Sequence, residues 1–177
     1  MTEREARPVG LEEMLEARER RAALHRAYVR EYACPALLFT LNIPGPVKTG
    51  PKVRACFEEG FQALIHALEE AGIPLRNAEA HQLVTGPEGC LAADGDARAL
   101  KRLAVELEER HPQGRLFDID LLDANGSPVS RADVGLEERT CFLCGESAKA
   151  CGRSRRHSLE ELARAVEELL ERGRETL

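Results

Sequence analysis

The chain has 177 residues, of which 43% are hydrophobic, so it is long enough for one domain with a substantial core. Its formal net charge of -6 argues against a general nucleic-acid binder, which needs excess positive charge to displace counterions from the phosphate backbone. No apolar run reaches the length of a membrane span, and the first residues lack the apolar segment of a signal peptide. We therefore expect a cytoplasmic protein with a single domain over residues 1–177, and neither a nucleic-acid nor a membrane partner.

The first third of the chain predicts a helix, a strand and a second helix. Residues 10–31 carry a narrow apolar stripe among many Arg and Glu, which indicates a solvated helix peripheral to the core. Residues 36–41 predict a buried strand, stopped by a loop over 42–46 that contains two prolines and a glycine. Apolar residues then recur at helical spacing from Phe57, and this helix is expected to end at Gly72.

The middle of the chain predicts a hairpin, a helix and one more strand. Short strands are expected over 80–85 and 90–93, joined by a Gly- and Pro-rich loop, and an amphipathic helix over 100–107. The order strand, helix, hairpin, helix, strand over residues 36–123 is typical of an α+β, ferredoxin-like split βαβ sheet. Both of its helices would lie on one face, which leaves the other face open to a ligand.

After this core we expect a short strand near 128–130 and a Cys- and Arg-rich segment with a terminal helix over 139–173. Ser158 and Glu161 have the spacing of a capping box at the start of that helix.

The last core strand carries two acidic residues at period two. Asp118 and Asp120 should share one face, while Phe117, Ile119 and Leu121 point to the other. Two carboxylates on one strand face could hold Mg²⁺, which prefers carboxylate oxygens, water and substrate phosphates. The alternative is plain alternation, since a half-solvated strand places polar residues outward in any case.

A candidate anion site lies where the first strand leads into the second helix. Lys48, Lys52 and Arg54 sit in this connection, and the unpaired N–H groups of a helix start favour phosphate. The spacing of a Walker A loop is missing, so a rigid, proline-stiffened connection is the alternative.

A second candidate anion site is the basic segment 139–157. It has a local charge of +4, in contrast to the acidic remainder of the chain. Its basic residues are Arg139, Lys149, Arg153, Arg155 and Arg156. A solvated loop whose cations offset nearby acids is the alternative.

The same segment contains four soft metal ligands. Cys141, Cys144, Cys151 and His157 could close tetrahedrally on Zn²⁺, although one Cys-x-x-Cys pair is less specific than two. Redox-silent thiols are the alternative for the cysteines. His157 could instead bind phosphate beside the arginines.

Six motifs in order resemble one family. They are Leu41-Asn42-Ile43-Pro44-Gly45-Pro46-x-Lys48, Thr85-Gly86-Pro87-Glu88, Gly114 to Asp120, Ser130-Arg131, Arg139-x-Cys141-x-x-Cys144, and Cys151-x-Arg153-Ser154-Arg155-x-His157-Ser158. The chain is similar in these motifs to the apo-citrate lyase phosphoribosyl-dephospho-CoA transferases, which are holo-acyl-carrier-protein synthases. The resemblance covers nearly the whole chain beyond the first helix.

The resemblance implies a nucleotidyltransferase, and we expect Mg²⁺ as its ion because of the two strand acids. It would take 2′-(5″-triphosphoribosyl)-3′-dephospho-CoA, attach the phosphoribosyl-dephospho-CoA part to a serine of the citrate lyase acyl carrier protein (the gamma subunit), and release diphosphate. The family's strand acids correspond to Asp118 and Asp120, which would be the catalytic residues and hold the ion. The substrate-binding residues would be Asn42, Lys48, Arg131, Arg139, Arg153, Arg155 and His157.

Two questions stay open at the level of sequence. The basic segment 139–157 could dock an acidic carrier protein rather than clamp phosphate. A competing class is a non-catalytic, zinc-stabilised protein-binding module, in which Cys141, Cys144, Cys151 and His157 organise a small lobe and the sheet presents an interaction face.

Overall fold

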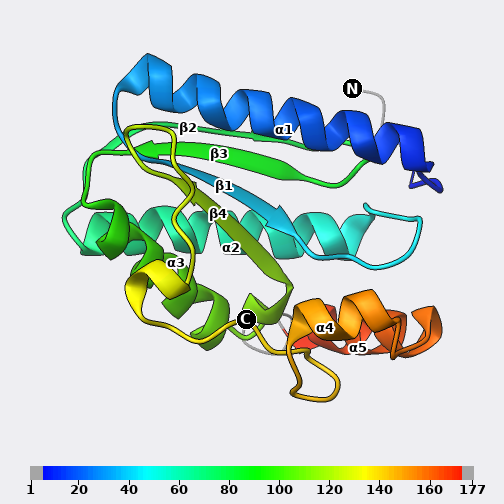
Figure 1. Cartoon of the computed structure of the whole chain (residues 1–177). Coiled ribbons are helices and arrows are strands. Elements are labelled where there is room, and N and C mark those ends of the chain that lie inside the picture. The colour runs from blue at the N-terminus through cyan, green and yellow to red at the C-terminus, as the bar shows by residue number, and fades with distance from the viewer. Residues whose placement is uncertain (1–5, 173–177) are drawn as a thin grey trace.

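The computed structural model describes residues 6–172 and contains a four-stranded antiparallel sheet in the order β2-β3-β1-β4 (Figure 1). The strands are β1 (Ala36–Leu41), β2 (Leu75–His81), β3 (Glu88–Ala93) and β4 (Phe117–Leu122). With a helix after β1 and another after β3, this is the predicted ferredoxin-like split βαβ arrangement, and the fold class is confirmed.

One face of the sheet is covered by α2 (Pro51–Glu70) and α3 (Ala97–Arg110), as the sequence predicts (Figure 1). Phe39, Phe57 and Phe61 meet there, with Phe39 and Phe57 ring centroids 5.3 Å apart, and Phe117 joins them from β4. α3 begins at Asp96, whose side chain accepts a hydrogen bond from the backbone N–H of Ala99.

A glycine in α2 allows this close packing of helix on sheet. A Cβ atom at Gly60 would lie 2.5 Å from Phe117 Cζ and 2.7 Å from Phe39 Cζ. We expect Gly60→Ala to lower the free energy of unfolding by about 1–3 kcal/mol, because overpacking outweighs the better helix propensity of alanine. Urea denaturation measures this. Gly152→Ala is the control, since no atom lies within 4 Å of a Cβ built there, and an equal loss in both variants would contradict the packing argument.

The opposite face is covered by α1 (Leu11–Tyr32), so two expectations were wrong: the helix is not peripheral, and this face is not open over most of the sheet (Figure 1). Tyr28 and Val29 pack on Ala36, Cys90 and Ala92, which form a second, smaller core. The small alanines and the cysteine let the helix approach the strands closely, so a narrow apolar stripe is enough to bury it.

His25 ties α1 to the sheet. It is buried, and its Nε2 lies 2.7 Å from the Ala36 carbonyl oxygen; a carbonyl only accepts, so Nε2 carries the proton. Burial is the main cause that lowers the pKa of His25 below its usual 6.5. Below pH about 6.5 the unfolded chain therefore binds a proton that the folded chain does not, so stability is full above that value and falls as the pH drops.

We expect the free energy of unfolding to decrease between pH 7 and pH 5.5 by up to about 1.4 kcal/mol per pH unit through this residue. His25→Gln keeps a donor for the Ala36 carbonyl but does not titrate, so its pH slope in urea denaturation should be smaller. Equal slopes in the wild type and the variant would show that another group controls acid stability.

Three strand boundaries differ from the sequence prediction. β2 was expected over 80–85 but ends at His81, because its register is set by pairing with β3, where His81 lies opposite Glu88. Residues 82–87 form the turn instead, and β3 starts two residues earlier than expected. The strand expected near 128–130 is only an isolated bridge between Leu122 and Pro128, since the Asp123 side chain closes a tight turn there.

The C-terminal part contains two helices, α4 (Ala148–Ser154), which the sequence analysis did not predict, and α5 (Leu159–Arg172). The capping box at Ser158 and Glu161 is confirmed by both of its hydrogen bonds. α5 buries Val166, Leu169 and Leu170 in the main core, and the expected end at residue 173 lies outside the described residues. Two 3₁₀ turns, Gly114–Leu116 and Ala132–Val134, complete the chain, and none of the described helices is long and apolar enough to cross a membrane.

Candidate functional site

β4 presents two carboxylates at the uncovered edge of the sheet. Its residues alternate as predicted: Phe117, Ile119 and Leu121 are buried, whereas Asp118 and Asp120 are exposed. The aspartates lie on the same face of the sheet as α1, because Asp118 pairs with Thr40 and Asp120 with Leu38. α1 packs mainly over β1 and β3, so the edge strand remains accessible.

Asp118 and Asp120 line a groove of about 450 Å³ between β4 and residues 130–149. The Arg139 guanidinium approaches Asp118, with 3.7 Å between Nη1 and Oδ1. Loss of solvation in the groove and the negative charge of Asp118 raise the pKa of Asp120. Because these effects make the ionised form of Asp120 more costly, a cation bound beside its carboxylate would stabilise the site.

Two arginines of the groove are held by other residues. Arg131 donates to Glu108 at 2.5 Å and to Glu109 at 2.8 Å, while Arg139 donates to the Arg115 carbonyl. Both guanidinium groups are therefore fixed in place rather than free to sample many rotamers.

The sequence analysis missed two buried charged residues beneath the groove. Lys101 Nζ donates to the Ile119 carbonyl at 2.9 Å, and Glu108 accepts from the Ile119 N–H at 3.1 Å, so both hold β4 at the residue between the two aspartates. The detectable signal was their spacing, since both lie on the inward face of α3 with Ala104 and Val105. A charged residue on an apolar helix face needs a partner, and here the partner is the strand that carries the acids.

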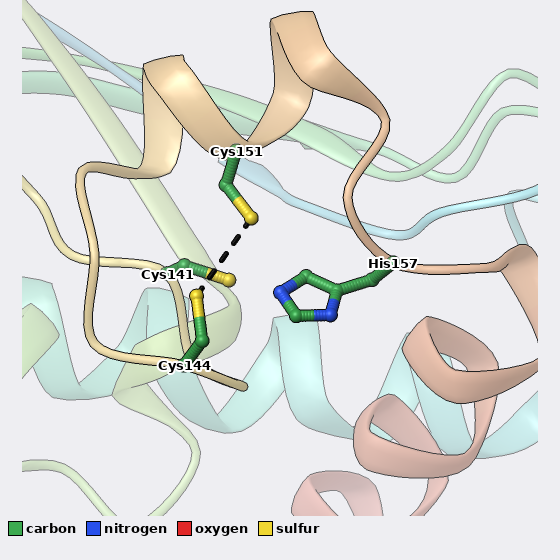
Figure 2. A group of neighbouring side chains, drawn as sticks. All are labelled: Cys141, Cys144, Cys151 and His157. Carbon is green, nitrogen blue, oxygen red and sulfur yellow. Dashed lines mark hydrogen bonds between the residues drawn. The ribbon is translucent and has the colours of Figure 1, made fainter.

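The four soft ligands come together beside this groove (Figure 2). One ligand atom from each of Cys141, Cys144, Cys151 and His157 lies within 4.8 Å of the others. Cys141 and Cys144 come from a tight loop in which the Gly145 N–H donates to the Cys141 carbonyl, Cys151 comes from α4, and His157 comes from the link to α5. The group can hold a metal ion.

The surroundings of Cys141 and Cys151 shift the pKa values of their thiols in opposite directions. Although burial alone would raise it, hydrogen bonds from the backbone of Leu143 and Cys144 lower the pKa of Cys141 to about 7. Burial and the neighbouring Cys141 raise the pKa of Cys151 to about 11. The Nε2 atom of His157 is buried without a hydrogen-bond partner, and Figure 2 shows it facing the sulfurs.

A second cavity of about 560 Å³ adjoins the cysteines. This cavity is lined by Asn42, Arg139, Arg155 and His157. Arg139 also lines the groove and therefore lies between the groove and the cavity.

Two of the predicted substrate-binding residues line neither cavity. Lys48 Nζ donates to the Ile43 carbonyl at 2.5 Å, and burial, followed by the charge of Arg21, lowers the pKa of Lys48. Arg153 is exposed on α4. The structure thus brings Asp118, Asp120, Arg131 and Arg139 together and places Lys48 on the loop beside Gly86.

The ferredoxin-like sheet exposes paired carboxylates beside fixed arginines, a combination that can bind a cation and phosphate oxygens. Comparison with protein families gives the class of the protein, a transferase: the family model for apo-citrate lyase phosphoribosyl-dephospho-CoA transferase (CitX) matches residues 9–173. Transferases of this name from Citrobacter koseri and Escherichia coli O7:K1 are 39% and 38% identical over 162 residues, covering 92% of this chain and 88% of each relative.

The chain belongs to the apo-citrate lyase phosphoribosyl-dephospho-CoA transferase family. The resemblance noted in the motifs is thereby confirmed, and the assignment as a transferase with it. The competing class, a non-catalytic zinc-stabilised binding module, is not favoured.

Proposed function

We propose that this chain transfers the phosphoribosyl-dephospho-CoA group of 2′-(5″-triphosphoribosyl)-3′-dephospho-CoA to a serine of the citrate lyase acyl carrier protein, the gamma subunit. The observation that carries the proposal is the pair of exposed carboxylates, Asp118 and Asp120, in a groove shared with Arg139, in a chain of this family. The acceptor and the donor follow from the resemblance, and the groove supplies the chemistry.

The proposed reaction is a nucleotidyl transfer. The serine oxygen bonds to the α-phosphorus, the bond from that phosphorus to the bridging oxygen of the β-phosphate breaks, and diphosphate leaves with the electron pair. The serine proton is released to solvent. Arg139, fixed by the Arg115 carbonyl, is placed to neutralise charge on the phosphate oxygens.

Asp118 and Asp120 are the residues that would hold Mg²⁺. They fit the ion because both lie on one strand face and because loss of solvation, followed by the charge of Asp118, raises the pKa of Asp120, an effect that a cation would oppose. The ion that these residues would hold would supply positive charge, which lowers the cost of negative charge on phosphate oxygens in the transition state. Lys101 and Glu108 act as positioning residues, since they fix the backbone of Ile119 between the two acids.

The other predicted substrate-binding residues differ in their roles, because they lie at different places around the two cavities. Arg131 is neutralised by Glu108 and Glu109 and shapes the groove wall more than it binds phosphate. Arg155 and Asn42 line the adjoining cavity. Lys48 and Arg153 lie outside both cavities. Arg153 is exposed and is left for an acidic carrier protein, whereas Lys48 is half-buried and is held by the Ile43 carbonyl.

We further propose that the Cys141, Cys144, Cys151 and His157 group holds structural Zn²⁺. The distance between the sulfurs of Cys144 and Cys151 is 3.8 Å, and a tetrahedral ion with Zn–S bonds of about 2.3 Å requires about 3.8 Å. The buried, unpartnered Nε2 of His157 supplies the fourth position. With four protein ligands the site is closed, which is typical of a structural ion and leaves His157 unavailable to phosphate.

The direct test is mass spectrometry of apo carrier protein incubated with this chain, Mg²⁺ and the triphosphoribosyl donor. We expect the carrier to gain the mass of one phosphoribosyl-dephospho-CoA group, with release of one equivalent of diphosphate. A carrier of unchanged mass, with donor and chain both intact, would refute the proposed activity.

A further inference from the structure

We propose that the cavity beside the Cys₃His group binds the adenosine diphosphate part of dephospho-CoA, with the adenine base among its apolar walls. This inference rests on the proposed function, because it places the remainder of the same donor. Its evidence consists of the walls and the charge of the cavity and of its position next to the acidic groove.

The walls of the cavity suit a flat, weakly polar ring. Pro44, Phe142, Leu159 and Leu162 contribute apolar surface around a volume of about 560 Å³. Leu159 is 63% exposed although it starts a helix that buries Leu169 and Leu170, so apolar area is left uncovered at the mouth of the cavity. Stacking of a base against such side chains is favourable and does not need specific hydrogen bonds.

The charge of the cavity suits a diphosphate attached to that ring. Of the described residues that line it, Arg139 and Arg155 are cationic and none is acidic, in a chain whose formal net charge is -6. Within residues 6–172 Arg155 makes no ion pair, whereas Arg131 in the groove is held by two glutamates. A guanidinium of this kind favours phosphate oxygens, which it can contact with two N–H groups at once.

The position of the cavity matches the covalent structure of the donor. In that molecule one ribose separates the triphosphate from the adenosine, so the base must lie within about one nucleotide of the reacting phosphorus. Arg139 and Ala148 line both the acidic groove and this cavity, which makes it the neighbouring compartment. A donor whose phosphates lie against Asp118 and Arg139 therefore extends past Arg139 into it.

Isothermal titration calorimetry with dephospho-CoA tests the inference, because this probe lacks the reactive arm and needs neither Mg²⁺ nor carrier. We expect the full chain, kept reduced, to bind one equivalent. Adenosine should compete with it, and 4′-phosphopantetheine should not. Competition by 4′-phosphopantetheine but not by adenosine would assign the cavity to the pantetheine arm and overturn the proposal.

A matched pair of leucines locates the binding. Leu159 and Leu11 are each the first residue of a helix and each is highly exposed, so a glutamate at either position is tolerated and favoured by the helix dipole. Leu159→Glu should weaken dephospho-CoA binding at least tenfold, since it adds negative charge beside the base and the diphosphate. Leu11→Glu should leave it unchanged, and equal affinities in the two variants would overturn the proposal.

Arg155→Asn separates the two halves of the ligand. Arg155 has φ of 47°, a conformation that asparagine tolerates, so the substitution does not strain the backbone. We expect about a fivefold loss of affinity for dephospho-CoA and no change for adenosine. A parallel loss for both probes would contradict the placement of the diphosphate.

Failure of the cavity assignment can be distinguished from failure of the proposed function. Binding of dephospho-CoA without any mass shift on the carrier would leave the cavity assignment standing and refute the transfer. Transfer that proceeds with the same donor KM in Leu159→Glu as in the wild type would refute the cavity assignment alone.

Discussion

Asp118→Asn and Asp120→Asn are each expected to lower the rate of transfer by about a thousandfold or more. Each substitution removes a negative charge from the proposed ion site but keeps nearly the same shape, and loss of one preorganised charge in a transfer site costs on this order. Both side chains are exposed, so neither variant should unfold the chain. Diphosphate release and the carrier mass shift measure the loss.

Asp94→Asn is the control for general loss of surface charge. The Asp94 side chain is 47% exposed and pairs with Arg76, and the Asp118 side chain is 53% exposed and lies near Arg139, so the two have similar settings at different places. Asp94→Asn should retain full transfer. Near-normal transfer in Asp118→Asn and Asp120→Asn together would exclude the carboxylate pair as the reaction centre.

Cys144→Ser is expected to eliminate bound zinc and to lower the melting temperature of the chain. Cys144 is exposed, so in the absence of a metal its replacement by serine would be nearly neutral. With zinc bound, the substitution removes one of four ligands and with it binding free energy that contributes to folding. Elemental analysis should fall from one zinc per chain to none, and calorimetry should show the lower transition.

Cys34→Ala is the matched control, because Cys34 belongs to the second core under α1 and not to the Cys₃His group. It should keep one zinc per chain. The sulfurs of Cys144 and Cys151 are also close enough for oxidation, so the purified chain should be weighed intact. If the chain as purified is lighter by two hydrogens, and the same chain binds no zinc after it has been reduced and supplied with zinc, then the pair forms a disulfide and the metal site is refuted.

The core of the fold could be predicted from periodicity and residue type. Some elements depend only on local chemistry, and the structure contains them as predicted. They are the alternating strand from Phe117 to Leu121, the helix with apolar residues at helical spacing from Phe57, and the loop with two prolines after β1. The register of β2 could not be predicted, because it is set by pairing with β3 rather than by its own residues.

The candidate site was predictable only in part for a similar reason. The two aspartates and the four metal ligands follow local spacings, and the structure brings each set together. The neutralisation of Arg131 by Glu108, and the separation of Lys48 from the groove, depend on contacts between distant segments. The role of α1 was misjudged because its partners are alanines and a cysteine, whose small side chains give little signal in the sequence.

The second, smaller core between α1 and the sheet has a practical consequence for shortened versions of this protein. Removing residues 6–32 would uncover Ala36, Cys90 and Ala92 over strands that are otherwise shielded from water. Newly exposed apolar strand surface is prone to self-association, and Glu88 would lose its partners Arg20 and Arg21, so the truncated chain should precipitate or form oligomers even though both cavities lie elsewhere. An affinity tag at this end should therefore be added before residue 1 and should not replace α1.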